Sequence, residues 1–365
     1  MKFYDKMTLL QKISVTLYSP SALKNNKITL LQKGAKMTPK ICLKPFKKLE
    51  IDSFGNVYTC CPCYINCYNI SNIFDENIKS IEDIWNSEKA KNLREKMMKG
   101  DYSFCNFDIC REPEFVENDG SYTTTPDLPE IVTLSYDKVC NIQCITCRNE
   151  IIKKDAERTV KVNEKLDSII IPLLKNTKEL TISGSGEALY SKHSRELIKK
   201  LTKTNESIKF VIYTNGILFN EQNCKILGLT NRVQSVFVSM HAFHKEIYDK
   251  IMVGSNLTTV MKNLEYISEM KKQNKINMAT INCVISDINY KEIPYMIDYA
   301  KSLDIDISFS IYTPWGADLD KNYDELAVWE PTHKNYKDFV DVIKQAKNTA
   351  YKNCRFAPAI EKVLA

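Results

Sequence analysis

Cysteines are the residues of this chain whose types and spacing could do chemistry. Cys140, Cys144 and Cys147 stand close together with the spacing Cys-x3-Cys-x2-Cys. Three thiolates in one tight loop can hold three irons of a cubane cluster, and they leave the fourth iron without a protein ligand. A catalytic metal site keeps such an open position, as catalytic zinc sites do. The spacing therefore favours an iron–sulfur cluster that can bind a further molecule.

A structural zinc ion is the alternative interpretation of this motif. Such a site usually takes paired ligands from two places in the chain and closes all four positions. The only other Cys-x2-Cys spacing, from Cys60 to Cys63, lies in a separate segment, and the sequence contains no His-x3-His pair. The iron–sulfur cluster is therefore the preferred interpretation.

A second group of cysteines precedes this motif. Seven cysteines fall between residues 42 and 110, and the chain contains 13 in all. An odd number in a reducing compartment argues against a disulfide framework. Clustered thiolates in such a compartment usually bind metal, so we expect a second metal-binding module here.

The composition predicts a soluble protein of the cytoplasm. The 365 residues carry 51 basic and 45 acidic side chains, and the net charge of +6 comes mostly from scattered lysines. Because the lysines form no block, we expect no nucleic-acid partner. We expect no membrane contact either, since no apolar run reaches the ~20 residues that a membrane helix needs. The N-terminal segment also lacks the apolar core of a secretion signal.

The elements that must position the first motif are strands and helices in alternation. We expect strands near residues 131–136, 179–183, 208–213, 235–239, 278–285 and 305–311. Amphipathic helices are expected near residues 160–175, 192–203, 221–227, 257–272, 290–303 and 336–347. Such strand-then-helix units predict an α/β fold, with a parallel sheet that curls toward a barrel. Ligands of such folds bind at the carboxyl ends of the strands.

The expected domain organisation follows from these patterns. It consists of an N-terminal extension at 1–39, a cysteine-rich module at 40–111, a linker at 112–129, a partial barrel at 130–350 and a C-terminal tail at 351–365. Within the module, Phe54-Gly55-Asn56 is a turn signal between two strand-like runs, and a helix is expected from Ser80 through Met98.

The three-cysteine motif resembles the CxxxCxxC signature that follows the first strand of the radical SAM enzymes. Further motifs resemble that family in the same order along the chain. Gly184-Ser185-Gly186-Glu187 is similar to its Gly-Gly-Glu-Pro element, and Thr214-Asn215-Gly216 is similar to its TNG turn. Ser239, at the end of the fourth expected strand, resembles its strand-end serine.

This resemblance implies a partial (βα)6 barrel in which Cys140, Cys144 and Cys147 hold a [4Fe–4S] cluster. S-adenosylmethionine would bind at the open iron. Gly184, Ser185, Gly186 and Glu187 would receive its amino group, whereas the TNG turn (Thr214, Asn215) and Ser239 would reach its ribose and carboxylate. One electron would cleave the sulfonium, and the resulting 5′-deoxyadenosyl radical would abstract a hydrogen atom from a substrate.

The segment from Cys42 through Gly55 to Cys60 resembles the opening of the SPASM and twitch modules, which carry auxiliary iron–sulfur clusters. These modules usually follow the barrel, but here the segment precedes it. The later Cys-rich run of a full SPASM module is absent, so one auxiliary cluster, expected to be [4Fe–4S], is implied. Its implied ligands are Cys42, Cys60, Cys105 and Cys110, and Cys61 or Cys63 could replace Cys60. A structural zinc ion is the alternative.

Other residues could act on the substrate. Cys283, on the fifth expected strand, could return a hydrogen atom to a substrate radical, although a buried cysteine is more often a small core residue. His241 stands where related sequences often have Asp, and it could face the substrate or simply pack. Tyr312, Trp315 and Gly316 follow the sixth expected strand and could floor a pocket or cap the barrel.

The substrate class is the least constrained feature. The order of the modules and the segment Asn289-Tyr290-Lys291-Glu292 resemble a subgroup that acts on carbohydrates, nucleotide sugars or small metabolites. We therefore expect a small-molecule substrate, with a ribosomal peptide as the alternative. The implied protein partner is a one-electron reductant such as flavodoxin or ferredoxin. An electron carrier or binding module without enzymatic activity would leave the glycine and TNG motifs unexplained.

Overall fold

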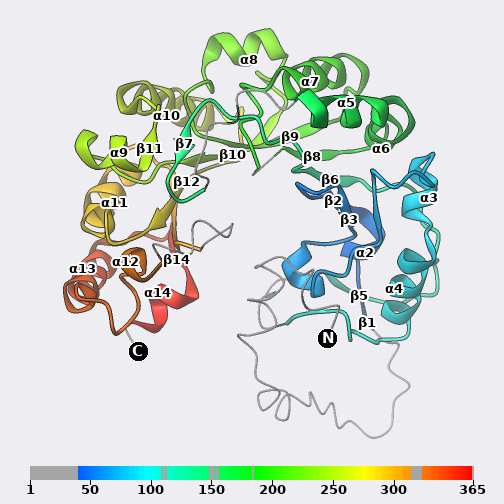
Figure 1. Ribbon diagram of the computed structural model, residues 1–365, viewed down its shortest axis with the longest axis horizontal. Coiled ribbons are helices and arrows are strands. Elements are labelled where there is room, and N and C mark those ends of the chain that lie inside the picture. Colours follow the sequence, from blue (N-terminus) through cyan, green and yellow to red (C-terminus); the bar gives the residue numbers. More distant parts are fainter. Residues whose placement is uncertain are drawn as a thin grey trace, which may run out of the picture. The chain divides into compact units, whose positions relative to one another are not determined.

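The computed structural model describes residues 40–107, 110, 113–147, 152, 156–182, 185–313 and 323–363 (Figure 1). The described residues fall into two compact units. The first unit extends to Tyr136 and includes Val160–Thr177, and the second unit comprises Asp137–Thr159 and the chain from Lys178 onward. The first expected strand of the barrel and much of its first helical segment are therefore grouped with the cysteine-rich module.

The first unit is built on short strands. They are β1 (Lys40–Cys42), β2 (Lys48–Ile51), β3 (Asn56–Tyr58), β4 (Ser71–Asn72), β5 (Phe115–Glu117) and β6 (Ile131–Leu134). β2 pairs parallel with β6 and antiparallel with β3, which pairs antiparallel with β4. The hairpin between β2 and β3 turns at Gly55, whose φ of +83° suits glycine, as the sequence predicted.

The expected linker contains a strand. β5 pairs antiparallel with β1, so that Phe115 lies opposite Cys42. The composition of residues 112–129 did not predict this strand, because it consists of only three residues, Phe115–Glu117. Pairing with β5 satisfies backbone groups of β1, the strand that carries the first cysteine.

The helices of the first unit are α2 (Lys44–Lys47), η3 (Pro62–Ile65), α3 (Ile81–Trp85), α4 (Glu88–Met98), the π-helical η4 (Leu166–Ile170) and α6 (Ile171–Leu174). The expected helix from Ser80 to Met98 is two helices, α3 and α4. Ser80 and Asp83 form a capping box at the start of α3. Ser87 accepts a hydrogen bond from the backbone N of Ala90 and starts α4 afresh, which is why the helix is interrupted.

A buried arginine on α4 joins three segments of the first unit. The Arg94 guanidinium donates to the backbone oxygens of Pro45, Trp85 and Thr124 over 2.8–3.0 Å. It also lies 4.0 Å from the centre of the Trp85 ring. Burial lowers its pKa to about 10. Hydrogen bonds from Arg94, rather than apolar contacts alone, therefore hold these three segments together at the centre of the module.

The second unit contains a parallel sheet. Its neighbouring strands are, in order, β14 (Cys354–Phe356), β13 (Asp306–Ile311), β12 (Met278–Ile285), β10 (Val233–Ser239), β9 (Lys209–Thr214) and β8 (Glu179–Ile182). Five of these were predicted. β14 lies in the expected C-terminal tail and pairs with β13, so that tail is part of the fold.

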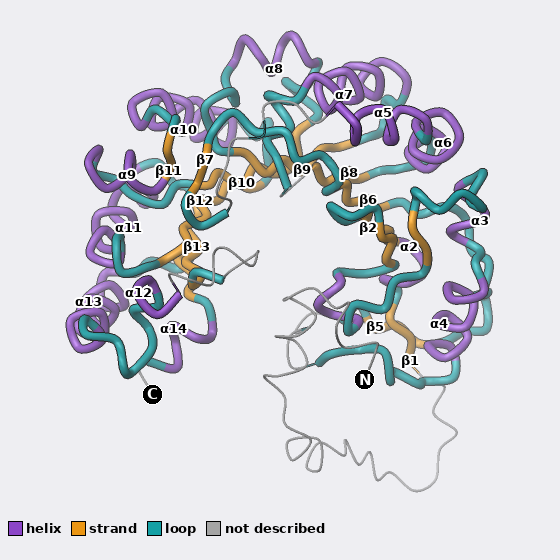
Figure 2. Tube along the Cα trace, in the orientation of Figure 1, coloured by secondary structure: helices purple, strands orange, loops and turns teal. Residues whose placement is uncertain are grey.

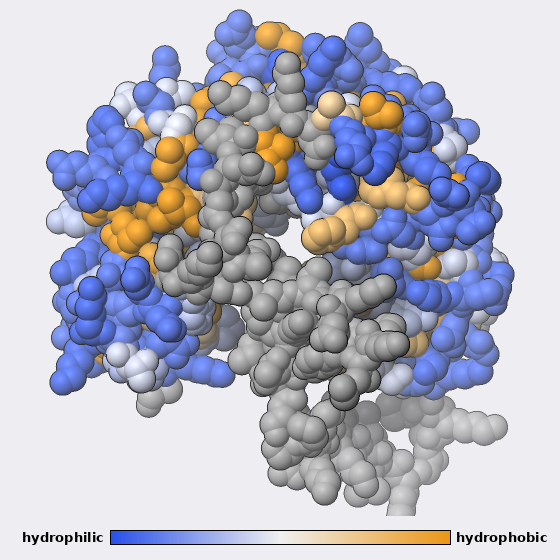
Figure 3. Space-filling view, viewed as in Figure 1, coloured by the Kyte–Doolittle hydropathy of each residue, from blue (hydrophilic) through white to orange (hydrophobic). Residues whose placement is uncertain are grey.

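The helices of the second unit are α7 (Lys192–Thr204), α8 (Glu221–Leu227), α9 (Lys245–Ile251), α10 (Leu257–Lys272), η5 (Tyr290–Glu292), α11 (Ile293–Ser302), α12 (Tyr323–Leu326), α13 (Tyr336–Thr349) and α14 (Pro358–Lys362). Helix α5 (Ala156–Glu164) runs across the division between the units. The large helices that follow the strands lie on one side of the sheet (Figure 2). Helix α13 buries Phe339, Ile343 and Ala346, and the surface around it is mainly hydrophilic (Figure 3).

Alternation along the strands separates the two faces of the sheet. On β12, Ala279, Ile281, Cys283 and Ile285 are almost fully buried. Asn282 is less buried and lies opposite Ser239 of β10 in the parallel register. No helix in the described part of the chain is long and apolar enough to cross a membrane.

Candidate functional site

The three-cysteine loop is held by main-chain hydrogen bonds. Cys144 belongs to the short strand β7 (Gln143–Cys144), which pairs antiparallel with β11 (Met252–Val253). The backbone N of Cys147 donates to the oxygen of Cys144 over 3.0 Å, and that of Cys140 donates to Ile152 over 2.9 Å. All three cysteines are partly exposed. Main-chain hydrogen bonds therefore fix the backbone that carries the three thiols.

The glycine motif after β8 packs directly against this loop. A Cβ atom at Gly186 would lie 2.5 Å from the backbone oxygen of Val139 and 2.7 Å from that of Asp137. Only glycine allows this approach. The backbone N of Glu187 then donates to the oxygen of Val139 over 2.8 Å. Gly184 lies outside the described residues, and Ser185 is partly buried beside Gly186.

The carboxylate of Glu187 is buried and joins the glycine motif to the TNG turn. It accepts hydrogen bonds from the Thr214 hydroxyl over 2.9 Å and from the backbone N of Asn215 over 2.7 Å. The backbone N of Leu189 adds a third bond of 3.3 Å. Burial raises the pKa of Glu187 to about 7, against the opposing effect of these donors. Glu187 thus orients the TNG turn, a role that its place in the sequence did not indicate.

The TNG turn is fixed from both sides. The side-chain amide of Asn215 donates to the side-chain oxygen of Asn141 over 2.8 Å. From helix α10, the amide of Asn263 donates to the backbone oxygens of Gly216 and Ile217 over 2.7 and 2.9 Å. Gly216 has a φ of +80°, which favours glycine. Asn141 and Asn263 were not predicted, because each acts through a partner that is distant in sequence.

Ser239 completes the row of residues at the carboxyl ends of the strands. Thr214 on β9 lies opposite Val238 on β10, so Ser239 follows directly after that pair. The structure therefore brings the cysteine loop, Gly186, Glu187 and the TNG turn together by hydrogen bonds, and it sets Ser239 on the adjoining strand. Three thiols in one loop, with glycine backbone beside it, fit a cluster that leaves one iron open.

Cys283 lies away from this row of residues. It is fully buried, and its Sγ lies 3.6 Å from the Sδ of Met296 on helix α11. Asn282, not Cys283, shares the face of Ser239. Burial raises the pKa of the Cys283 thiol. Cys283 packs between the sheet and helix α11, and this arrangement favours the core-residue interpretation over the hydrogen-donor role.

His241 follows β10 and is 5% exposed. Its Nδ1 accepts a hydrogen bond from the backbone N of Val284 over 3.2 Å. Its backbone oxygen accepts from the Asn289 amide over 2.6 Å. Burial lowers its pKa to about 4. Tyr312 is buried, whereas Trp315 and Gly316 lie outside the described residues.

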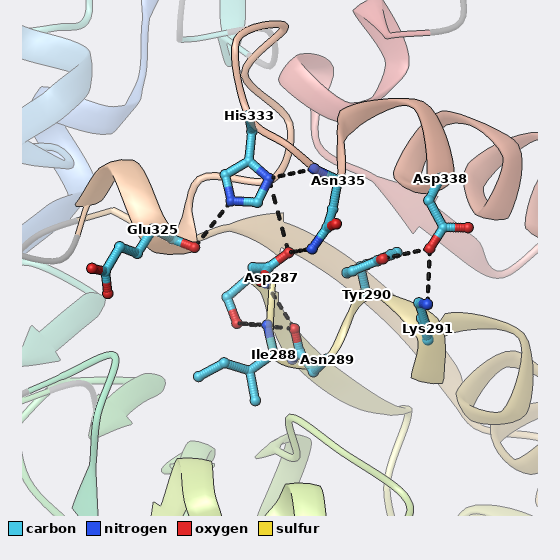
Figure 4. A network of polar contacts seen from close by, with 10 residues as sticks. Asp287, Ile288, Asn289, Tyr290, Lys291, Glu325, His333, Asn335 and Asp338 are labelled. Atoms are coloured by element: carbon cyan, nitrogen blue, oxygen red, sulfur yellow. Dashed lines mark hydrogen bonds and ion pairs between the residues drawn. The ribbon is translucent and has the colours of Figure 1, made fainter.

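A network of polar contacts holds the loop after β12 (Figure 4). The Asn335 amide donates to Asp287 over 2.7 Å, and the Tyr290 hydroxyl donates to Asp338 over 2.5 Å. The Lys291 ammonium lies 2.9 Å from the same Asp338. This network ties the Asn289–Glu292 segment to helix α13 and its preceding loop.

The cysteines of the first unit form two groups. Burial raises the pKa of the Cys105 thiol to about 12, and the nearby thiols of Cys42, Cys60 and Cys110 add to the rise. The four cysteines proposed as auxiliary ligands therefore share one environment. Cys61 and Cys63 instead form a hydrogen bond with each other, and Cys67 lies near both.

Backbone contacts bring the separate segments of this first group together. The backbone N of Asn106 donates to the oxygen of Tyr64 over 2.8 Å, and that of Cys110 donates to Asn106 over 2.9 Å. A set of four thiols fits an iron–sulfur cluster. Within the part of the chain that the structure describes, no three His, Cys, Asp or Glu side chains are arranged for a single metal ion.

The structure thus places a three-cysteine loop beside the carboxyl ends of parallel strands, an arrangement that suits an iron–sulfur cluster with one open iron. The sequence profile of the Radical SAM superfamily matches residues 136–300, and that of the SPASM iron–sulfur cluster-binding domain matches residues 42–112. The chain therefore contains a radical SAM domain, with a SPASM domain ahead of it. The expected α/β fold class is confirmed, as are a [4Fe–4S] cluster and S-adenosylmethionine as the cofactors that these domains imply.

The relatives among characterised protein families share 27–30% sequence identity with this chain. A probable GTP 3′,8-cyclase of Methanococcus maripaludis is 27% identical over 190 residues, which cover 51% of this chain and 60% of the relative. GTP 3′,8-cyclase of Helicobacter pylori is 28% identical over 185 residues, or 49% and 54%. The FeMo cofactor biosynthesis protein NifB of Methanocaldococcus jannaschii is 30% identical over 122 residues, or 31% and 40%. The chain thus spans little more than half the length of the cyclases.

The solved structures to which this chain shows some similarity include SuiB of Streptococcus suis. It is 16% identical, with a TM-score of 0.40 over 78% of this chain and 56% of SuiB. The enzyme anSMEcpe with bound AdoMet is 22% identical, with a TM-score of 0.40 over 58% of this chain and 57% of that chain.

Proposed function

We propose that this chain binds S-adenosylmethionine at a cluster held by Cys140, Cys144 and Cys147, and that it abstracts a hydrogen atom from a small-molecule substrate. The observation that carries the proposal is the set of hydrogen bonds that joins the cysteine loop, Glu187 and the TNG turn. When bound together, the cluster and S-adenosylmethionine supply a 5′-deoxyadenosyl radical for that abstraction.

The residues around the cysteine loop have distinct tasks in this proposal. Gly186 exposes backbone beside the loop, and Ser185 offers polar groups to the amino end of S-adenosylmethionine. Glu187 holds Thr214 and Asn215 in place by hydrogen bonds. Ser239 offers a hydroxyl to the ribose or carboxylate.

The first unit carries the auxiliary cluster in this proposal. Its ligands are Cys42, Cys60, Cys105 and Cys110, because the first two and the last lie near enough to Cys105 to raise the pKa of its thiol. Because Cys61 and Cys63 form a hydrogen bond with each other, Cys60 is preferred as the ligand from that segment. A reductant such as flavodoxin or ferredoxin supplies the electron for the first cluster.

The substrate class is proposed from the names of the relatives. Two of them are GTP 3′,8-cyclases, which supports a small metabolite with a sugar and a nucleobase over a peptide. GTP is therefore the first substrate to test, followed by nucleotide sugars. This chain matches only part of each cyclase, so its product can differ from theirs.

The test is anaerobic incubation of the iron-loaded protein with S-adenosylmethionine and dithionite. We expect 5′-deoxyadenosine to form, and a variant with Cys140, Cys144 and Cys147 all changed to Ala should form none. Cys354→Ala is the matched control, because Cys354 lies on β14, outside both cysteine groups. The absence of 5′-deoxyadenosine from the wild-type protein would refute the proposal. Deuterium transfer from labelled GTP or sugar nucleotides to 5′-deoxyadenosine would identify the substrate.

A further inference from the structure

Three cysteines of the first unit have no task in the proposed function. Cys61 and Cys63 form a hydrogen bond with each other, and Cys67 lies near both. All three are free cysteines. They do not form a metal site, because no three His, Cys, Asp or Glu side chains of the described residues are arranged for a metal ion. A group of neighbouring thiols that binds no metal has a different chemistry, which is exchange with disulfides.

A short helical turn brings these thiols together. Cys61 is the residue before the 3₁₀ helix η3, and Cys63 lies within that helix. The backbone N of Tyr64 donates to the oxygen of Cys61 over 2.9 Å, and that of Cys67 donates to the oxygen of Pro62 over 2.8 Å. The second bond folds the end of the turn back onto its beginning. The main chain therefore holds Cys67 beside the pair that precedes it.

The backbone of Cys67 has a conformation that a cysteine rarely adopts. Asn66 and Cys67 have φ values of +48° and +56°. The other described residues with positive φ, apart from glycines, are Asn274 and Asp304. Asn and Asp are enriched in this region of φ, whereas cysteine is not. Such a conformation persists where the surrounding structure fixes it, as the hydrogen bond to Pro62 does here.

The preceding residue, Cys60, lies in a different environment. It is 5% exposed and packs with Tyr58 and Ile65 in a small core cluster. Cys61 is partly exposed, and Cys63 is exposed. A small molecule in solution can therefore reach Cys63, while the core protects Cys60.

The pair formed by Cys61 and Cys63 meets the distance requirement for a disulfide. Because the two residues are two positions apart, their Cα atoms are separated by at most ~7 Å. A disulfide spans Cα atoms up to about that distance. Their thiols are already in contact. Oxidation of this pair thus requires no movement of distant segments.

We propose that Cys61 and Cys63 form a thiol–disulfide exchange site for small disulfides of the glutathione type. The sulfur of Cys63 attacks one sulfur of the small disulfide, whose S–S bond breaks and releases the first small thiol. The sulfur of Cys61 then attacks that of Cys63, and the second small thiol leaves. The two cysteines lose two electrons and two protons, and the small disulfide gains them as two thiols.

The inference relies on one part of the proposed function, the ligand set in which Cys60 rather than Cys61 or Cys63 holds iron. The exchange itself uses neither S-adenosylmethionine nor the one-electron reductant. Its test is therefore separate from the formation of 5′-deoxyadenosine, and either result can stand without the other.

Three variants separate the roles of the thiols. Cys63→Ala lacks the attacking sulfur and should not react. Cys61→Ala lacks the resolving sulfur and should retain one glutathione on Cys63. Cys67→Ala is the matched control, because it removes a thiol of the same turn that the two steps do not use. This control should react like the wild-type chain.

The measurement is anaerobic incubation of the iron-loaded chain with oxidised glutathione, followed by an acid quench, alkylation of the remaining thiols and mass spectrometry of peptides. For the wild-type chain we expect two reduced glutathiones released per chain, a disulfide between Cys61 and Cys63, and unchanged iron content. This measurement decides the matter even where a variant fails to fold.

Several outcomes would overturn the inference. A wild-type chain that keeps its iron and releases no reduced glutathione would do so and leave the proposed function intact. A disulfide that joins Cys63 to Cys67, or glutathione retained by Cys67→Ala, would refute the role of Cys61. Iron released during oxidation would show that cluster ligands react instead. Iron missing from Cys61→Ala before oxidation would overturn the proposed ligand set and this inference together.

Discussion

The side-chain amide of Asn215 donates a 2.8 Å hydrogen bond to the side-chain oxygen of Asn141 and so joins the TNG turn to the cysteine loop. Asn141→Asp keeps the acceptor and should leave the contact in place. Asn215→Asp removes the donor and sets two oxygens against each other, which should cost about 1–3 kcal/mol. The thermal midpoints of the two iron-loaded variants should therefore differ, with Asn215→Asp the lower. Equal midpoints would show that the contact contributes nothing.

Iron content tests the two ligand sets. Two cubane clusters require about eight irons per chain, and the triple change of Cys140, Cys144 and Cys147 to Ala should remove about half. Cys105→Ala should lose the other half. Cys61→Ala, by contrast, should keep its iron, because the Cys61 thiol pairs with Cys63. Zinc in place of iron in the purified protein would contradict the assignment.

The buried Glu187 carboxyl makes stability depend on pH. Its pKa is about 7 in the folded chain against an ordinary 4.5. The folded state therefore keeps the proton at pH values where the unfolded state has lost it. The contribution is fully present below pH 4.5 and is lost as the pH rises through 7, by up to ~3 kcal/mol. Thermal midpoints of the S-adenosylmethionine-free protein from pH 5 to 8 should fall more steeply for wild type than for Glu187→Gln. Parallel curves would refute the account.

Cys283→Ala tests the packing role of that thiol. The side chain contacts Met296 in a fully buried position, so the change should cost about 1 kcal/mol of stability. Formation of 5′-deoxyadenosine and the identity of the product should not change. A variant that still folds and forms 5′-deoxyadenosine but yields a different product would restore the hydrogen-donor hypothesis.

Local patterns were enough to predict the parallel strands, because strand alternation is visible within short segments. The proposed cysteine ligands likewise rest on spacing within short segments, and they stay a prediction. The face of Cys283 was not predictable in this way. Asn282 and Cys283 are neighbours in a run of apolar residues, and only the register with Ser239 and the contact with Met296 separate them.

The anchoring residues were hidden for a different reason. Asn141, Asn263, Asn289 and Glu292 each act on backbone or side chains far away in the sequence. Nothing in their immediate neighbours distinguishes such a residue from a polar side chain in solvent. The strand β14 was missed because its three residues, Cys354–Phe356, follow a helix without a clear alternating pattern.

The pairing of β7 with β11 has a consequence for which sequence changes the cysteine loop tolerates. Cys144 lies opposite Met252, and the bonds that hold this pair are made by peptide groups alone. The side chains of β11 can therefore vary without loss of these bonds, whereas a proline at a donating position of β11 would remove one of them.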